Sequence, residues 1–417
     1  MSHESASART NQRLLFVTDG IRSFAMGYFS IIFVIIARNL GIAALGLGIV
    51  TGLSMAVGIG ITHYLTLVAQ RQGARIPLVI SGLLMASTGV TVLLAHSVNV
   101  LYVGALLGFL PPNGGMFIGA LVEGVFAQTP SDRRTKVFAR NGLIVTSMGA
   151  LGALFASFPT LIRMNEATGL RFLTALYLFL GLAIVVASAN VVDSGSGVGA
   201  VRSSGESAPA KELFVVTDGA DSSQTGSSEA AINRLALLFV VDSAGSGVVA
   251  SSLIIYWLRY HFNLSIVSLS LLFFGMDVLS GISYPLAERI SRKVGLLNTA
   301  VFTHIPSSIL LVAVPFAPAA VVASVLLLAR SLLVEMDVPT RKSYIASIVK
   351  PEERRSAASR TSMGRQAGRS IGPVVGGYLL SNVSAVAPFL VSGVLKISYD
   401  LMLWRSFRAV RSRKEHL

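Results

Sequence analysis

The chain has 417 residues, of which 53% are hydrophobic and only 13% are charged. An ordinary soluble domain carries about 25% charged residues, so this composition excludes a soluble enzyme of the usual kind, a disordered protein and a coiled coil. The formal net charge is +14, but the basic residues fall in short gaps between apolar segments, so we expect a lipid bilayer as the partner and no nucleic acid. Cysteine is absent, which excludes disulfides and thiolate chemistry.

Apolar segments long enough to cross a membrane recur along the whole chain. A bilayer core requires about 20 predominantly apolar residues for each crossing helix. The first set of such segments covers residues 14–37, 45–69, 76–95, 99–127, 137–162 and 170–192. The second set covers residues 235–258, 267–290, 297–316, 318–348, 357–381 and 386–407. The sequence therefore predicts an all-α membrane protein with twelve transmembrane helices in two six-helix bundles.

The composition changes between the two sets, where the chain is rich in Ser, Gly and Ala. Such a stretch cannot bury a core, so we interpret it as a flexible linker. The expected domains are an N-terminal six-helix bundle at 1–192, a cytoplasmic linker at 193–233 and a C-terminal six-helix bundle at 234–417.

Lysine and arginine are distributed unequally between the two sides of the predicted bundle. If the N-terminus is cytoplasmic, most of them lie on the cytoplasmic side, including Arg133, Arg134 and the basic tail at 405–414. Cytoplasmic loops carry this excess of positive charge in membrane proteins. We therefore expect an integral protein of the cell (inner) membrane with both termini and the linker in the cytoplasm.

The two halves also repeat short segments in the same order. Leu14–Asp19 returns as Leu237–Asp242, Gln70–Gly73 returns weakly as Arg292–Gly295, and Pro130–Thr135 returns as Pro351–Ser356. These three correspondences predict a duplicated six-helix unit.

Six plus six spans, a long polar central loop and basic cytoplasmic loops resemble the major facilitator superfamily of secondary transporters. The loop motif of that family, G-x-x-x-D-R-x-G-R-[KR], has a remnant at Gln70–Arg75, in which Gln70 stands at the Asp position. The segment from Met336 to Arg341 resembles a bacterial subgroup whose substrate is unassigned. The resemblance implies two bundles facing a central cavity that is lined by spans one, four, seven and ten, and a rocking motion that alternates access to it.

Charged side chains are costly inside a bilayer, so each one within a span is a functional candidate. The proton-coupling candidates are Asp19, Asp242, Asp277 and Asp337. The candidates for substrate binding or charge pairing are Arg22, Arg330, Glu335, Arg365 and Arg369. Arg22 follows Asp19 by three residues and shares its helical face, so this pair is either a proton site, an inner gate or a structural ion pair.

Two spans contain residues that interrupt helices. The helix-break candidates are Pro111, Pro112 and Asn113 in span four and Pro339 in span ten. A broken helix exposes backbone groups that bind solutes or ions, although a bend that serves packing alone is the alternative. Arg365 and Arg369 align with Ile144 and Met148 of the first half, so their charge is absent from the repeat. This asymmetry suggests substrate binding or coupling.

The sequence contains no metal-ligand spacing, no phosphate-binding loop of the form G-x-x-x-x-G-K-[ST] and no nucleophile–base constellation. We therefore expect no enzyme activity, no metal and no cofactor. The prediction is a monomeric secondary transporter that exports a small organic solute in exchange for protons. The alternatives are a facilitator or importer of an organic anion that binds the span-eleven arginines, and a non-transporting membrane receptor or assembly subunit.

Overall fold

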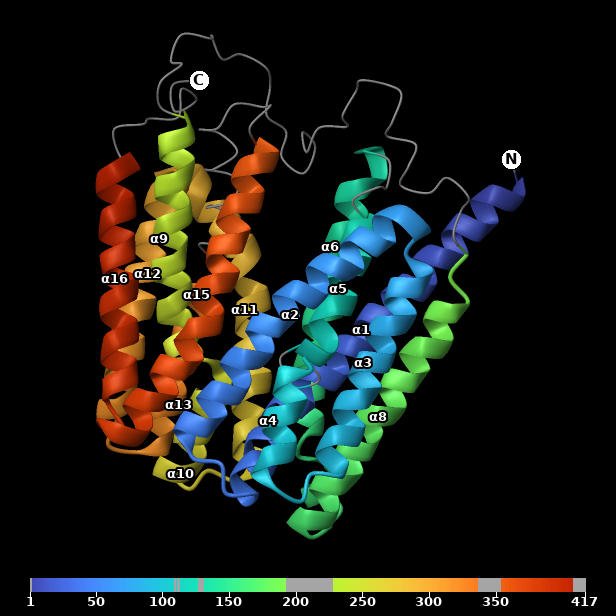
Figure 1. Cartoon of the computed structure of the whole chain (residues 1–417). Coiled ribbons are helices and arrows are strands. Elements are labelled where there is room, and N and C mark those ends of the chain that lie inside the picture. The colour runs from blue at the N-terminus through green and yellow to red at the C-terminus, as the bar shows by residue number, and fades with distance from the viewer. Residues whose placement is uncertain are drawn as a thin grey trace. The chain divides into compact units, whose positions relative to one another are not determined.

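A computed structural model describes residues 2–108, 110, 113–126, 131–192, 228–336 and 354–407 of the chain. These residues are helical almost throughout, and no strand occurs among them (Figure 1). Eight helices in this part are long and apolar enough to cross a membrane, and two further apolar helices are shorter. The all-α membrane fold predicted from the sequence is confirmed, and a helix lies at each of the predicted spans.

The helices of the N-terminal part follow the predicted spans, and the spans at 99–127 and 137–162 are each divided into two helices. They are α1 (Ser2–Asn39), α2 (Ala44–Gln72), α3 (Arg75–Leu93), α4 (Val98–Leu106), α5 (Asn113–Phe126), α6 (Ser131–Phe155), α7 (Phe158–Leu161) and α8 (Glu166–Ala189). The fourth predicted span consists of α4 and α5. The chain leaves α4 through Gly108, whose φ of 72° lies in the left-handed region that favours glycine. Pro111 and Pro112 fall outside the described residues.

The C-terminal part contains an interruption that the sequence analysis did not anticipate. Its helices are α9 (Ser228–Val248), α10 (Ser251–His261), α11 (Ile266–Val294), α12 (Leu296–Ala313), the 3-10 helix η3 (Val314–Phe316), α13 (Ala320–Val334), α15 (Arg354–Asn382) and α16 (Ala387–Phe407). The predicted span at 235–258 is divided between α9 and α10, and Ala250, with φ −52° and ψ 149°, is the residue that precedes α10. Glycine weakens a helix interior, and the end of α9 contains Gly245 and Gly247.

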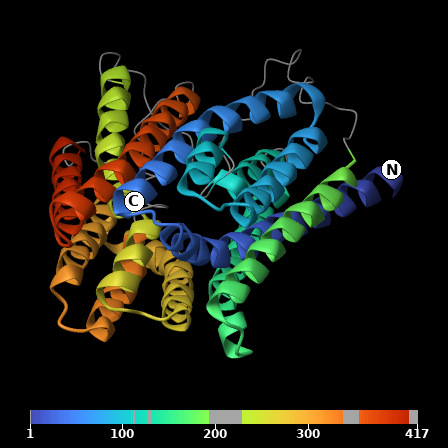
Figure 2. The same cartoon turned by 60° about the horizontal axis from the view of Figure 1, so that its bottom comes forward.

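Contacts between residues divide the chain into two compact units. The first comprises Met1–Ala43, Leu53–Ala208 and Leu264–Phe274, and the second comprises Ala44–Gly52, Pro209–Asn263 and Gly275–Leu417. The expected boundaries at residues 192 and 234 remain a prediction. Within the first unit, α1 packs against α6 and α8, and α3 packs against α8 (Figures 1 and 2).

Aromatic side chains fill the core of the first unit between α1 and α8. The rings of Phe29 and Tyr177 stack with centroids 3.9 Å apart, and Tyr28 packs edge-on against Tyr177. All three side chains are buried. Offset aromatic pairs add about 0.5–1.5 kcal/mol each beyond the area that they bury. This core fixes α1, which carries Asp19 and Arg22.

Small residues bring α15 close to α9 in the second unit. A Cβ atom added at Gly368 would lie 2.5 Å from the carbonyl oxygen of Val240 and 2.9 Å from the nitrogen of Ala244. The glycines at every fourth position of α15 therefore form a face on which the backbone of α9 rests. Beside it, Phe239, Val301 and Tyr399 belong to a buried core that joins α9, α12 and α16.

Candidate functional site

In the first unit, a buried carboxylate on α1 accepts hydrogen bonds at both of its oxygens. Asp19 of α1 is 1% exposed. Its Oδ1 accepts a hydrogen bond from Nε of Arg22 at 2.6 Å, and its Oδ2 accepts one from Nδ2 of Asn141 of α6 at 2.8 Å. The guanidinium of Arg22 lies against Gly119 of α5, where an added Cβ would stand 3.2 Å from Cζ. Asp19 and Arg22 are thus a fixed ion pair that joins three helices.

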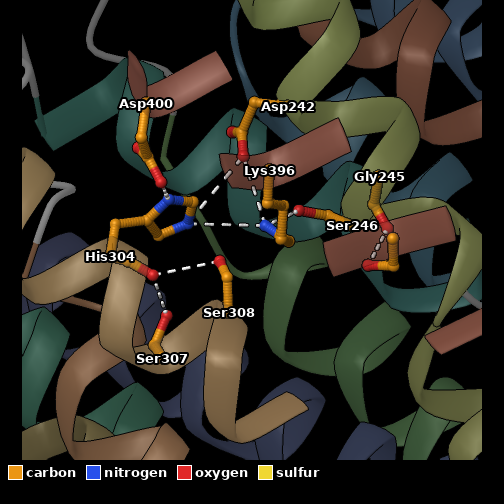
Figure 3. A network of polar contacts seen from close by, with 9 residues as sticks. Asp242, Gly245, Ser246, His304, Ser307, Ser308, Lys396 and Asp400 are labelled. Atoms are coloured by element: carbon orange, nitrogen blue, oxygen red, sulfur yellow. Dashed lines mark hydrogen bonds and ion pairs between the residues drawn. The ribbon is translucent and has the colours of Figure 1, made fainter. Parts of the chain in front are cut away.

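The second unit holds a larger polar network, which links α9, α12 and α16 (Figure 3). Asp242 of α9 occupies the place in the repeat that Asp19 has in the first unit. Its cation is the ammonium of Lys396 of α16, which donates to Oδ1 of Asp242 at 3.2 Å and to Oγ of Ser246 at 2.7 Å. Asp242 and Lys396 are both buried. A buried ion pair requires such additional hydrogen bonds, because the desolvation of both charges is costly.

An imidazole lies between the two carboxylates of this network. Nδ1 of His304 of α12 lies 2.8 Å and 2.9 Å from the two carboxylate oxygens of Asp400 of α16. Nε2 of the same ring lies 3.4 Å from Nζ of Lys396 and 3.9 Å from Oδ1 of Asp242. His304 and Asp400 are 2% and 1% exposed. Four ionisable groups therefore meet in the interior of one helical unit.

Hydroxyl groups complete the surroundings of the network. Ser307 and Ser308 both donate to the carbonyl oxygen of His304, at 2.8 Å and 3.0 Å (Figure 3). Ser392 donates to the carbonyl oxygen of Gly245 at 2.7 Å, which ties α16 to α9 one turn away from Lys396. The bonds of Ser307 and Ser308 stay within α12, whereas the bond of Ser392 joins two helices.

A third group of charges lies between α11 and α13 of the second unit. Arg330 of α13 interacts electrostatically with Glu335 and with Asp242, and Asp277 of α11 interacts with Glu335. The hydroxyl of Tyr284 donates to Oε2 of Glu335 at 3.4 Å. Among the residues that the structure describes, Asp277 has no hydrogen bond and no ion pair, and Nε of Arg330 is buried without a hydrogen-bond partner.

Arg365 and Arg369, the two predicted site arginines on α15, differ in their surroundings. The guanidinium carbon of Arg365 lies 5.5 Å from the centre of the Phe239 ring, a cation–π contact. In the first unit, Arg140 lies 4.9 Å from the ring of Phe16, which is the repeat counterpart of Phe239. The contact of Arg365 thus has an equivalent in the first half, although the aligned residue there is Ile144. Arg369 is exposed, and we find no hydrogen bond or ion pair for it in the described part of the chain.

Several predicted residues cannot be placed. Asp337 and Pro339 fall outside the described residues, as do Pro111 and Pro112, while Asn113 begins α5. The sequence analysis also missed His304, Lys396 and Asp400 as members of one site. The signal that could have found them is the spacing of Lys396 and Asp400, which are four residues apart and share one face of the last span.

No group of three or more His, Cys, Asp or Glu side chains is arranged for a metal ion in the part of the chain that the structure describes. The polar groups that these sites offer are carboxylates, an imidazole, an ammonium and guanidinium groups.

Comparison with known proteins gives three findings. Residues 235–416 match the sequence model of the Major Facilitator Superfamily. The chain is 23% identical over 425 residues to YJR124C, an uncharacterized membrane protein of Saccharomyces cerevisiae, and the match covers 96% of this chain and 95% of that protein. The structure is similar to a variant of the nucleoside transporter NupG, with a TM-score of 0.71, 13% identity and coverage of 96% of this chain and 99% of that chain.

The structure of this chain is also similar to that of a D-xylose–proton symporter. The TM-score is 0.69, the identity is 15%, and the match covers 94% of this chain and 97% of that chain. At these identities, the likeness to the solved structures concerns the fold. The family model that matches residues 235–416 agrees with the resemblance stated above.

Proposed function

We propose that this chain, whose fold is that of the major facilitator superfamily, is a secondary transporter that carries a small organic solute across a lipid membrane by alternating access and couples this movement to protons. The observation that carries the proposal is Asp277. Its carboxylate lies within α11, which is long and apolar enough to cross a membrane, and no cation partners it among the described residues. An ionised carboxylate is costly in such a place, and uptake of a proton removes that cost.

The other carboxylates have different surroundings. Asp19 is held by Arg22 and Asn141, and Asp242 is held by Lys396. A cation at hydrogen-bond distance stabilises the charged form of a carboxylate. We therefore assign the coupling proton to Asp277 and the role of fixed charges to Asp19 and Asp242, while Asp337 remains a candidate from the sequence alone.

The direction of transport, the location and the assembly state are also part of the proposal. The predicted mode is export in exchange for protons, by a monomer in the cell (inner) membrane with both termini in the cytoplasm. The excess of Lys and Arg in the predicted cytoplasmic loops supports the orientation. The structurally similar proteins include a proton symporter, so the test below measures both directions.

A second candidate function is the facilitated movement or import of an organic anion. It is favoured by Arg369, an exposed guanidinium on α15 for which the described residues offer no ion pair. A cation within a span attracts an anionic solute. This function predicts flux that responds to the membrane voltage and needs no proton gradient.

The experiment begins with a solute screen, because the substrate must be identified before flux is measured. A ligand at 100 times its Kd stabilises the purified protein by about 2.7 kcal/mol. The best solute is then followed in proteoliposomes with an imposed pH gradient or an imposed voltage. We expect Asp277→Asn to lose the gradient-driven movement and to keep solute binding.

The matched control is Glu288→Gln, because Glu288 lies on the same helix, is exposed and pairs with Arg292 one turn away. It should transport like the wild type. Wild-type accumulation by Asp277→Asn would refute the assignment of the coupling proton, and voltage-driven flux without a pH gradient would establish the second candidate function instead.

A further inference from the structure

The guanidinium of Arg22 on α1 is held in one orientation by bonds from two of its nitrogens. Nε donates to Oδ1 of Asp19 at 2.6 Å, and Nη2 donates to Oγ of Ser23 at 3.2 Å. Asp19 is itself fixed, because its Oδ2 accepts from Nδ2 of Asn141 at 2.8 Å. A group that is oriented in advance loses little conformational entropy when it binds a further partner.

The flat face of this guanidinium lies against the backbone of α5. A Cβ atom added at Gly119 would stand 3.2 Å from Cζ of Arg22 and 3.4 Å from both Nη1 and Nη2. Nearly equal distances to three atoms of a planar group mean that the face of the group, and not its edge, is turned toward the glycine. The N–H groups lie in that plane, so they point along α5 and not into it.

Part of the hydrogen-bonding capacity of Arg22 is unused. A guanidinium has five N–H donors, and in the described part of the chain Arg22 donates only to Asp19 and Ser23, which leaves Nη1 without an acceptor. The side chain is 15% exposed, so the surrounding helices do not seal it completely. The end formed by Nη1 and Nη2 presents the fork that binds both oxygens of a carboxylate.

The neighbouring charges favour a ligand group with a single negative charge. Asp19 already balances Arg22, so a group with two negative charges would add to the charge of Asp19. Arg140 of α6 supplies a further positive charge close by, because it precedes Asn141 in the chain and lies over the ring of Phe16, one helical turn before Asp19. A carboxylate matches both this charge and the free donors.

We propose that Arg22 is the centre of a carboxylate-binding site in the first unit. Asp19 and Ser23 orient the guanidinium, Gly119 leaves room for its face, and Nη1 and Nη2 bind the two oxygens of a small organic monoanion. Gly119 is a positioning residue, because it acts only through Arg22. That this monoanion is the transported solute rests on the proposed function, whereas the binding itself does not.

Calorimetric titration of the purified full chain with benzoate tests the site, and benzamide serves as the uncharged analogue of similar shape. We expect the wild type to bind benzoate, and to bind benzamide at least about tenfold more weakly, because the hydrogen bonds to a charged acceptor are lost. Absence of benzoate binding, or equal affinities for the two probes, would overturn the proposal.

Removal of the guanidinium locates the binding. Arg22→Gln should lower the affinity for benzoate at least about tenfold. This variant leaves Asp19 buried without its cation and is at risk of misfolding, so the double variant Arg22→Gln with Asp19→Asn, which removes both charges, is measured beside it. A folded variant of either kind that binds benzoate as the wild type does would also overturn the proposal.

Gly119→Ala keeps every charge and tests the orientation of the guanidinium. The three nearest atoms that the added Cβ would meet belong to the flexible end of Arg22, which must shift by a few tenths of an ångström. The variant should keep at least the melting temperature of the wild type and bind benzoate several-fold more weakly, with no change in its affinity for benzamide. The matched control is Gly124→Ala on the same helix, where the added Cβ meets nothing within 4 Å. Equal benzoate affinities of the two variants would overturn the role of Gly119.

The outcome is separable from that of the transport experiment. If benzoate binds through Arg22 while Asp277→Asn keeps its gradient-driven movement of solute, the carboxylate site stands and the assignment of Asp277 fails. If Asp277→Asn loses that movement while benzoate does not bind to the wild type, the reverse holds.

Discussion

The ammonium of Lys396 lies 3.2 Å from the carboxylate of Asp242 and joins α16 to α9 across 154 residues of sequence. In the first unit, Asp19 has the equivalent place in the repeat, but its cation is Arg22, which is only three residues away. The same carboxylate position is thus neutralised locally in one half and by a distant helix in the other. Loss of the cation therefore has different structural consequences in the two units.

Removal of Lys396 should destabilise the second unit strongly. Lys396→Met leaves Asp242 as a buried carboxylate without its ammonium, and breaking a buried ion pair in this way costs about 3–5 kcal/mol. The melting temperature of the purified protein measures the effect. The double variant Lys396→Met with Asp242→Asn removes both charges and should recover part of the loss. Equal destabilisation of the single and double variants would contradict a direct coupling of these two groups.

Loss of Asn141 should weaken the attachment of α6 to α1. Asn141→Ala removes the hydrogen bond from Nδ2 to the ionised carboxylate of Asp19, and hydrogen bonds to charged groups contribute about 1.5–3 kcal/mol. Thermal unfolding of the variant checks this value. Asn190→Ala is the matched control, because Asn190 is exposed and donates only to the carbonyl oxygen of Val186 on its own helix. A similar loss of stability in both variants would argue against the role of the Asp19 contact.

The close approach of α15 to α9 predicts that Gly368 does not tolerate a methyl group. The added Cβ of Gly368→Ala would lie 2.5 Å from the backbone oxygen of Val240, so the helices must separate, and overpacking of this kind costs about 1–3 kcal/mol. In Gly142→Ala of α6, the added Cβ meets nothing within 4 Å. That control should be neutral or stabilised by about 0.5–1 kcal/mol, because alanine favours a helix interior. Comparable stability of the two variants would disprove the helix contact.

The fold was predictable from the sequence because a membrane imposes a simple rule. Each apolar stretch of sufficient length forms a helix that crosses the bilayer, so the positions of α1 and α11 follow from composition alone. The division between α9 and α10 did not follow from it. Glycine and serine are common inside membrane helices, and the segment from Gly245 to Ser251 therefore carries no clear signal for an interruption.

The candidate site was predictable only where its contacts are local. Asp19 and Arg22 share one helical face, so their spacing already indicated the pair. Asp242 and Lys396 are on different helices, and neither hydropathy nor periodicity tells which faces of two helices meet. The same reason explains why His304 gave no signal in the sequence, since a single histidine in an apolar span is informative only when its neighbours are known.

Substitutions of Arg365 and Arg369 on α15 should separate stability from anion binding. Arg365 lies over the ring of Phe239, and a cation–π contact contributes about 0.5–2 kcal/mol, so Arg365→Gln should lower the melting temperature without any ligand. Arg369 is exposed, so Arg369→Gln should leave the melting temperature unchanged. If the substrate is an organic anion, Arg369→Gln should also abolish the stabilisation that this anion gives to the wild type.

Thermal unfolding of both variants, with and without the anion found in the solute screen, measures the two effects in one experiment. Arg365 has a structural counterpart in Arg140, which lies over Phe16 of the first unit, so Arg140→Gln is the matched control for its stabilising contact and should behave in the same way. An anion that stabilises Arg369→Gln as much as the wild type would remove Arg369 from the binding site. In that case, the second candidate function would lose the observation that favours it.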